Sequence, residues 1–435
     1  MGKKITTVIL ALGILAGLFA GCTGNGEDKN TLKVAVLESA YGSEMWEKIV
    51  DEFEKDHEGV TVELVAEKNL EDVIGAQMKS GDYPDVVHLA TGREAGLTET
   101  MIRDNMLTEM TDVLEMTVPG ESVRVKDKLI PGFTDTLATN PYSDGKTYFA
   151  PMFYGPCGLF YNRQLFIDNN WELPETWEDM FILGDKAKEK GIYLFTYPTT
   201  GYFDAFFYAL LASAGGTDFY NRAMRYEEGI WDTQQAKMAF DTVNQLAKYT
   251  EPTTVSNANN DNFLKNQQLV LDNKALFMPN GTWVVGEMAD APRAEGFEWG
   301  FMPLPAFNNG DRYSFTFFEQ LWIPKEAKNP ELAKEFVAYL YSDEAVGIFA
   351  EAGAIQPVKG VSADLKGDSK LFYSIYDNGA KAVMGGFAAT EPVEGVSIAD
   401  SLFGTIDSLV SGNKTLEDWM NAVKAASDRL REALK

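Results

Sequence analysis

Side chains suited to binding a hydroxylated ligand follow two of the strands that the sequence predicts. Glu38 and Tyr41 come directly after the first strand, and Thr91 and Arg93 come after the third. Carboxylates accept hydrogen bonds from hydroxyl groups, and guanidinium groups donate them. Ligands of open α/β sheets lie beyond the carboxyl ends of the strands. These loops therefore predict a binding site, with two alternatives left open: Glu38 as a cap for the turn at Ser43, and Arg93 in a surface ion pair.

Catalysis has no comparable signature. The sequence contains no Gly-x-Ser-x-Gly, His-Glu-x-x-His or Cys-x-x-Cys motif. A glycosidase needs two carboxylates across a sugar, and none of the 65 acidic residues belongs to a recognisable pair. Cys157 lies in an apolar run that favours a buried hydrophobic role, and only His57 and His88 could act as its base. We expect no enzymatic activity, no catalytic residue, no cofactor and no metal.

The N-terminal residues have the pattern of an export signal. Lys3 and Lys4 precede an apolar run at 8–20 that is too short to span a bilayer comfortably. The ending Leu18-Phe-Ala-Gly-Cys22 resembles the bacterial lipobox, in which the cysteine is lipidated. We predict a signal peptide at 1–21, lipidation of Cys22 and a flexible tether at 22–31. The mature protein would lie outside the cytoplasm, anchored to the bacterial cell membrane.

Composition indicates a globular and strongly acidic protein. An apolar content of 45% excludes disordered and collagen-like classes, and the 414 residues that follow the signal suffice for two or three lobes. Loss of the two lysines in the signal would lower the formal net charge from −27 to −29. Such a charge repels phosphate backbones, so we expect no nucleic-acid partner. With Cys22 lipidated, Cys157 would have no disulfide partner.

The first third of the chain alternates strand and helix patterns. Strands are predicted at 32–37, 60–65 and 85–89. Ser43 should cap a helix that carries Trp46, Ile49, Val50 and Phe53 on one face, and further helices are predicted at 70–78 and 96–105. This order predicts a mostly parallel sheet with helices on both faces.

A second α/β unit is predicted to begin near Cys157. Thr176 should cap a helix at 177–190, with Asp179 completing a capping box, and Gly215-Gly216 should end an apolar helix at 203–214. The other predicted elements are strands at 192–196 and 275–278 and helices at 233–247, 262–273, 281–288, 330–341, 344–351, 398–411 and 416–434.

Six motifs, in order, resemble the ABC-transporter extracellular solute-binding proteins for carbohydrates, the family 1 type of lipoprotein. The motifs are Gly145-Lys-Thr-Tyr-Phe-Ala-Pro151, Gly158-Leu-Phe-Tyr-Asn162, Leu173-Pro-Glu-Thr-Trp-Glu-Asp-Met180, Ala275-Leu-Phe-Met-Pro-Asn-Gly-Thr-Trp283, Gly300-Phe-Met-Pro-Leu-Pro305 and Lys328-Asn-Pro-Glu-Leu-Ala-Lys-Glu-Phe336. The N-terminal stretch further resembles the branch that takes N-acetylglucosamine and chitobiose-type amino sugars. That likeness lies in Ser39-Ala-Tyr-Gly42, Val73-Ile74, Gly81-Asp-Tyr-Pro-Asp-Val86 and Leu97-Thr-Glu-Thr100.

The resemblance implies an α/β, two-lobed, periplasmic-binding-protein-like fold of type II, with a mainly parallel sheet flanked by helices in each lobe and a hinge between the lobes. The N-terminal lobe would take 32–156 and 306–352, and the C-terminal lobe 157–305 and 353–435. The implied function is that of a monomeric receptor that captures a mono- or oligosaccharide between the lobes and delivers it to the transmembrane subunits of an ABC permease. The alternatives are an exported carbohydrate-active enzyme and a surface glycan adhesin.

The resemblance also implies which aromatic residues contact the sugar, because a pyranose ring has an apolar face that stacks on aromatic rings. Trp283 occupies the family's Gly-x-Trp position, Tyr202 and Phe203 match an aromatic position, and Tyr154 precedes the crossover strand. Core packing is the alternative for each of them.

Three further residues complete the predicted site. Phe318 and Glu319 lie on the segment that would return to the first lobe, where an acid flanked by aromatic residues needs a partner. Trp231, in a Gly-Ile-Trp-Asp loop, either reaches the ligand or packs in the core.

Overall fold

The computed structural model of the chain describes residues 30–434 except 40, 92, 94, 309 and 389. The predicted signal peptide, the predicted lipidation site at Cys22 and nearly all of the predicted tether lie outside these residues. Among the described helices, none has the length and apolar content that crossing a bilayer requires.

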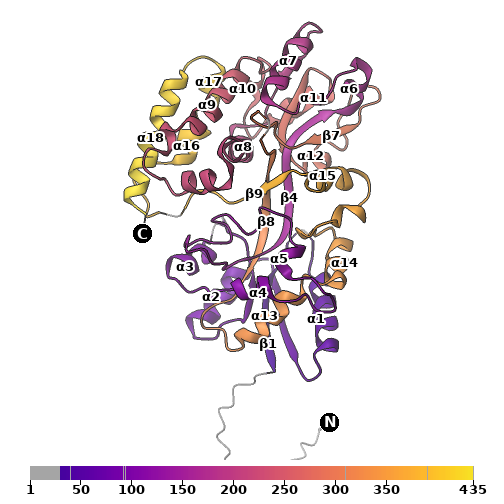
Figure 1. Cartoon of the computed structure of the whole chain (residues 1–435), viewed down its shortest axis with the longest axis vertical. Helices are drawn as coiled ribbons and strands as arrows, with labels where there is room; N and C mark the ends of the chain where they lie inside the picture. The colour runs from indigo at the N-terminus through magenta and orange to yellow at the C-terminus, as the bar shows by residue number, and fades with distance from the viewer. Residues whose placement is uncertain are drawn as a thin grey trace, which may run out of the picture.

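The described residues form two lobes joined by long strands (Figure 1). The strands are β1 (Thr31–Leu37), β2 (Thr61–Glu67), β3 (Val86–His88), β4 (Ala150–Asn162), β5 (Tyr193–Phe195), β6 (Ala275–Gly281), β7 (Trp299–Met302), β8 (Tyr313–Trp322) and β9 (Lys381–Val383). The helices of the lower lobe in Figure 1 are α1 (Glu44–Asp56), α2 (Leu70–Lys79), α3 (Leu97–Arg103), α4 (Thr111–Glu115), α5 (Val125–Lys128), α13 (Pro330–Tyr339) and α14 (Asp343–Glu351).

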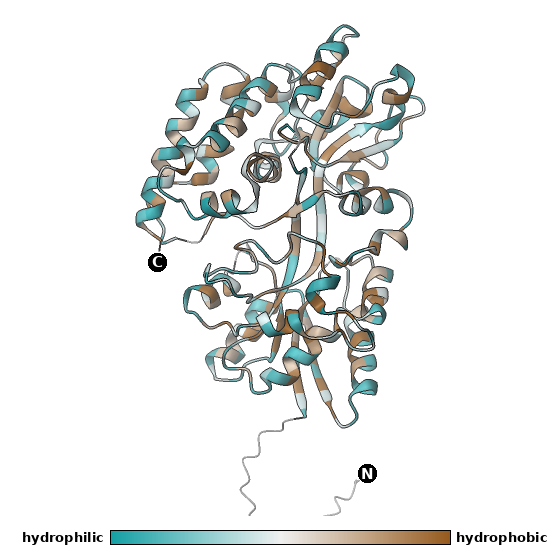
Figure 2. Ribbon diagram, in the orientation of Figure 1, coloured by the Kyte–Doolittle hydropathy of each residue, from teal (hydrophilic) through white to brown (hydrophobic). Residues whose placement is uncertain are grey.

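The upper lobe is mostly helical. Its helices are α6 (Arg163–Asn169), α7 (Trp177–Lys188), α8 (Phe203–Met224), α9 (Gln234–Ala247), α10 (Thr254–Asn257), α11 (Phe263–Leu271), α12 (Val284–Glu287), α15 (Gly367–Asp377), α16 (Ile398–Leu402), α17 (Ile406–Val410) and α18 (Leu416–Glu432). Short 3-10 helices are η1 (Thr200–Tyr202), η2 (Ile230–Asp232) and η3 (Val361–Ala363). Figure 2 shows hydrophilic residues on outward faces of helices such as α18, with hydrophobic residues turned inward.

One sheet passes through both lobes, in the strand order β2-β1-β3-β8-β4-β6-β5. The predicted parallel pairing holds for β1 with β2 and β3 and for β5 with β6. The pairs that β4 makes with β6, β7 and β8, and the pair of β3 with β8, are antiparallel. The reason is the direction of the chain: β4 leads from the lower lobe to the upper one, and β8 returns. The sheet is therefore mixed, and the expectation of mainly parallel pairing fails along these crossover strands.

Most predicted elements are present, and local sequence explains them. The buried face of α1 consists of Met45, Trp46, Ile49, Val50 and Phe53, as 3.6-residue periodicity requires. Burying such side chains contributes about 1.5–3 kcal/mol each, so this face fixes the helix to the sheet.

Predictions made from capping residues have mixed outcomes. Thr176 and Asp179 form the predicted capping box of α7. Ser43 stands at the start of α1 but makes no capping hydrogen bond with its side chain. Gly216, at φ 76° and ψ 177°, ends the first helical segment of α8 as predicted, and a second helical segment follows at once. A single helix at 398–411 is wrong, since α16 and α17 are separate.

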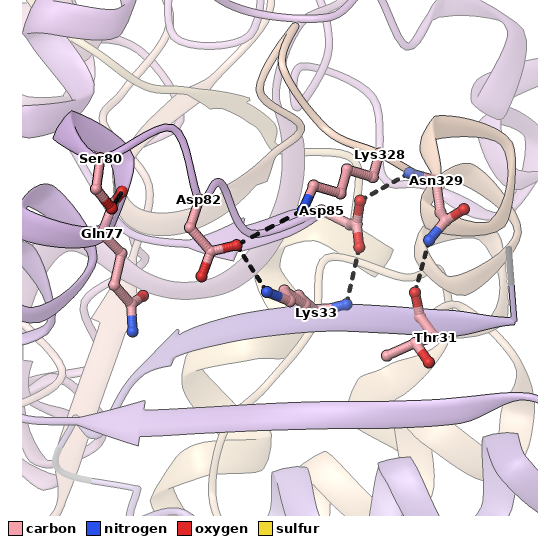
Figure 3. Close-up of polar contacts among 8 residues, drawn as sticks. All are labelled: Thr31, Lys33, Gln77, Ser80, Asp82, Asp85, Lys328 and Asn329. Atoms are coloured by element: carbon pink, nitrogen blue, oxygen red, sulfur yellow. Dashed lines mark hydrogen bonds and ion pairs between the residues drawn. The ribbon is translucent and has the colours of Figure 1, made fainter. Parts of the chain in front are cut away.

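Polar contacts connect the amino end of β1 to neighbouring segments of the lower lobe (Figure 3). The Lys33 Nζ atom lies 2.7 Å from Asp82 Oδ1, and its backbone N–H donates to Asp85 Oδ2 at 2.9 Å. Asp85 also accepts from the backbone N–H of Asn329 at 2.8 Å, and the Asn329 amide donates to the Thr31 carbonyl at 2.6 Å. These contacts join the start of β1 to the residues that precede α13.

Candidate functional site

The middle of β8 is exposed although both its ends are buried. Phe317 is 46% exposed, and Phe318 and Glu319 are half-buried. Toward one end, Phe315 belongs to a core in the upper lobe, and toward the other Leu321 belongs to a core that reaches the lower lobe. Side chains alternate along a strand, so Phe317 and Glu319 share one face while Phe318 points to the other. We call Phe317, Glu319 and the side chains around them the β8 surface.

An aromatic group lies on the upper-lobe side of this surface. It consists of Tyr202 in η1, Trp283 just before α12, and Phe317. The Trp283 indole N–H donates to the Tyr202 hydroxyl at 3.3 Å, and the centroid of its ring is 5.5 Å from that of Phe317. Trp283 is 37% exposed. A half-exposed indole held by a hydrogen bond and a ring contact offers an apolar surface of fixed orientation to a ligand.

The β6–α12 turn sets the position of that indole. A Cβ atom on Gly281 would lie 2.0 Å from the Trp283 ring. The absence of a side chain at Gly281 therefore lets the ring lie over the backbone where β6 ends.

A polar group lies on the lower-lobe side. Glu319 Oε2 is 3.2 Å from His88 Nε2, and the His88 ring is fully buried between Trp46 and Phe153. Tyr41 packs edge-on against Phe153, with centroids 5.7 Å apart. Burial raises the pKa of Tyr41, and the charge of Glu319 raises it further, so the hydroxyl stays protonated and able to donate.

Two predicted polar residues take part in ion pairs. Two hydrogen bonds join the Arg93 guanidinium to the Glu71 carboxylate. Nε donates to Oε1, and Nη2 donates to Oε2 at 3.2 Å. Burial acts to raise the pKa of Glu71, but the hydrogen bond and charge of Arg93, together with a backbone hydrogen bond, outweigh it, and the pKa is lowered. Lys68 Nζ lies 3.6 Å from Glu38 Oε1. Arg93 thus makes an ion pair, which was its alternative role. Glu38 is half-buried at the end of β1.

Three predicted aromatic residues lie inside the core. Tyr154 is 2% exposed and packs edge-on against Tyr373 and Phe133, with centroids 4.9 Å away in both cases. Phe203 is also buried, 4.9 Å from the ring of Tyr197.

Trp231 is likewise buried, between Phe240 and Phe387. The burial of these three favours packing over ligand contact. Of the other two predicted residues, Phe318 points away from the exposed face and packs against the core, and Thr91 is exposed in the loop after β3.

Three residues at or near the β8 surface were not predicted as ligand contacts: Phe317, His88 and Asp204, which lies in the first turn of α8 and whose charge acts on Tyr202. Phe317 precedes two predicted residues, and strict alternation along the strand would have favoured it over Phe318. His88 could have been placed from the end of β3, where Thr91 and Arg93 were placed. Asp204 follows two predicted aromatic residues, and its polar side chain in an apolar helix was an available signal.

A recess of about 140 Å³ lies elsewhere, against β1 and β2. Its lining includes Lys33, Glu63, Gln77, Asp82 and Tyr83. The hydrogen bond from Lys33 lowers the pKa of Asp82, and this pair belongs to the network of Figure 3. Because Lys33 lies near the amino end of β1, the recess is separate from the β8 surface, which lies beyond the carboxyl end. Its lysine is already paired with Asp82, so we base no binding site on it.

The sequence matches the family of bacterial extracellular solute-binding proteins over residues 38–347. The chain belongs to this family, whose members bind solutes outside the cytoplasm. This finding confirms the predicted family and agrees with the mixed α/β, two-lobed fold.

Similar proteins have names that refer to sugars. The chain is 23% identical over 354 residues to the diacetylchitobiose binding protein NgcE of Streptomyces coelicolor, which covers 79% of this chain and 73% of that protein. It is 22% identical over 368 residues to the multiple sugar-binding protein of Streptococcus mutans, covering 81% of this chain and 82% of that one. The solved structure of the bacterial solute receptor AcbH, described as preferring β-D-galactopyranose, has a TM-score of 0.69 and 17% identity and covers 92% of this chain and 100% of its own. At this identity the AcbH likeness establishes the fold.

Proposed function

We propose that this protein is the substrate-binding component of an ABC importer for a mono- or oligosaccharide. The observation that carries the proposal is the β8 surface, where an aromatic group from the upper lobe faces the same strand as a polar group from the lower lobe. A sugar requires both an apolar platform and hydrogen-bonding groups. The names of the relatives support the same class of ligand.

The ligand that we favour within this class is an N-acetylated amino sugar. The motifs in the N-terminal part resemble that branch, and two relatives are named for binding diacetylchitobiose. Tyr202, Trp283 and Phe317 would stack on the sugar rings. Tyr41 and Glu319 would bind hydroxyl or amide groups, with Glu38 and Thr91 at the margin.

The two lobes would close on the sugar and present the closed form to the permease. We propose the lobe boundaries 32–156 with 306–352, and 157–305 with 353–435, and a monomeric receptor. The lipid on Cys22 would keep the receptor near the permease and so raise its effective concentration. Mass spectrometry of the mature N-terminal peptide tests this anchor, and an unmodified Cys22 would refute it.

Thermal unfolding with a panel of glycans tests the function. The panel contains N-acetylglucosamine, chitobiose, maltose and xylo-oligosaccharides. A ligand of the folded state raises the melting temperature, by an amount that grows with ligand concentration over Kd. We expect at least one member to do so and to be recovered intact afterwards.

Two results would contradict the proposal. Release of smaller sugars would indicate a carbohydrate-active enzyme. The absence of stabilisation by every glycan would indicate another solute class or an adhesin.

A further inference from the structure

A carboxylate without a cationic partner lies beside the aromatic group. Asp204 is in the first turn of α8, two residues after Tyr202, and is half-buried. Its charge acts on Tyr202, on Cys157 of β4 and on Tyr208 of α8. The next residue, Ala205, lines a small recess together with Cys157 and with Asn280 of β6, so the start of α8 lies against the crossover strand β4. Its side chain accepts a hydrogen bond from the Ala205 backbone N–H.

The described residues around Asp204 supply no positive charge to balance its carboxylate. No ion pair among the described residues includes Asp204, and in the described part of the chain its carboxylate has no hydrogen bond besides that from Ala205. A carboxylate can accept about four hydrogen bonds. Desolvating such a group without replacing its water contacts is costly. Burial accordingly raises the pKa of Asp204 to about 6.

We propose that Asp204 contacts the ligand, accepting hydrogen bonds from two sugar hydroxyl groups while Trp283 and Tyr202 stack on the ring. This assignment rests on the proposed function and adds a specificity-determining residue to it. A sugar would supply donors that the protein itself does not supply. Asp204 would then select the position of hydroxyl groups on the sugar that lies against the aromatic group.

The rival explanation is structural. A carboxylate in the first turn of a helix interacts favourably with the helix dipole. In that case the ionised side chain stabilises the folded protein, whereas a ligand-binding carboxylate held without partners destabilises it until the ligand arrives. The two explanations predict opposite signs for Asp204→Asn in the unliganded protein.

The sign of the change in stability caused by Asp204→Asn depends on pH. The titratable groups that face Asp204 are Cys157, Tyr202, Tyr208 and Tyr220, and the pKa of each is raised, so all are neutral near pH 6. Because the folded pKa of Asp204 is raised, its protonated form favours folding. That contribution is present below the ordinary carboxyl pKa and is lost as pH rises through about 6.

The experiment compares the wild type, Asp204→Asn and the control Asp241→Asn, an exposed acid on α9. Without ligand, Asp204→Asn should melt roughly 1–3 °C above the wild type at pH 7.5. It should melt at the same temperature as the wild type at pH 4, while Asp241→Asn follows the wild type throughout. With the panel glycan that stabilises the wild type most, Asp204→Asn should raise Kd about 10- to 100-fold at pH 7.5.

Each other outcome overturns something specific. A lower melting temperature of unliganded Asp204→Asn at pH 7.5 would assign Asp204 to the helix dipole and overturn the proposal. An unchanged Kd would overturn ligand contact and leave the sugar-binding function intact. If no glycan binds the wild type, the proposed function fails, and the assignment of Asp204 to a sugar fails with it.

Discussion

Trp283 is the central residue of the aromatic group, because it contacts both Tyr202 and Phe317. Its N–H donates to the Tyr202 hydroxyl, and its ring centroid lies 5.5 Å from that of Phe317, so the indole has little freedom to rotate. An exposed aromatic side chain gains little stability from the folded state itself. Its restraint is therefore better explained by a ligand that needs a platform than by packing.

Replacing Trp283 with alanine should weaken binding of the stabilising glycan at least tenfold, because the stacking surface is lost. The melting temperature of the unliganded protein should change little, since the ring is 37% exposed. Isothermal titration measures the first effect and thermal unfolding the second. Tyr193→Ala, at a 41% exposed aromatic on β5, is the matched control and should bind as the wild type does. Equal affinities for Trp283→Ala and wild type would remove Trp283 from the site.

Local sequence was sufficient to place Glu38, Tyr41 and Trp283 at the ends of strands, because strand patterns and turn residues are short-range. It was insufficient for Tyr154, Phe203 and Trp231. Their burial depends on residues remote in sequence, such as Tyr373 for Tyr154 and Phe387 for Trp231. Which aromatic residue is a platform and which is core is decided by those distant contacts.

At the scale of elements, the β6–α12 junction determines the geometry of the aromatic group. β6 is buried along its whole length and ends at Gly281, and the chain turns before α12 begins at Val284. The buried strand fixes the turn, and the turn directs Trp283 outward. A change in the turn should therefore act on binding without touching the ligand.

Gly281→Ala tests this indirect effect. The new methyl group would overlap the Trp283 ring, so the ring must move. We expect a loss of glycan affinity approaching that of Trp283→Ala and a shift in tryptophan fluorescence. Gly286→Ala within α12 is the control, because a Cβ atom there meets nothing within 4 Å. Alanine in a helix is favoured over glycine by roughly 0.5–1 kcal/mol, so this variant should bind normally and melt no lower than the wild type. Unchanged affinity in Gly281→Ala would show that the turn does not hold the ring.

Elements with one periodic face were predictable, but the crossover strand β8 was not. The pattern of α1 and the capping box of α7 are local, and both agree with the structure. β8 was missed because its burial follows no alternation: the strand passes from one core across an exposed middle into another. The predicted helix at 398–411 failed for a local reason, since Gly404 lies between α16 and α17 and glycine is unfavourable in the interior of a helix.

The whole molecule is asymmetric about its crossover strands. On one face a single core extends from Val34 in the lower lobe through Tyr154 to Phe301 in the upper lobe. On the other face β8 is exposed. The β4–β8 ladder is irregular between Pro151 and Tyr154, and such irregularities bend strands. A structure joined on one face and exposed on the other bends most easily toward the exposed face, because that motion separates no packed side chains.

Sugar binding should therefore close the lobes over the β8 surface. A ligand shifts a conformational equilibrium by its difference in affinity for the two states, and a sugar held by Trp283 above and Glu319 below favours the closed one. Small-angle X-ray scattering should record a fall in the radius of gyration when the stabilising glycan is added to the wild type. Trp283→Ala at the same glycan concentration should keep the larger radius, and Tyr193→Ala should contract like the wild type. If the glycan saturates the wild type and the radius of gyration does not fall, the site is already in its bound form before the sugar binds. The exposed middle of β8 would then be a preformed groove, and the irregular ladder would have no part in capture.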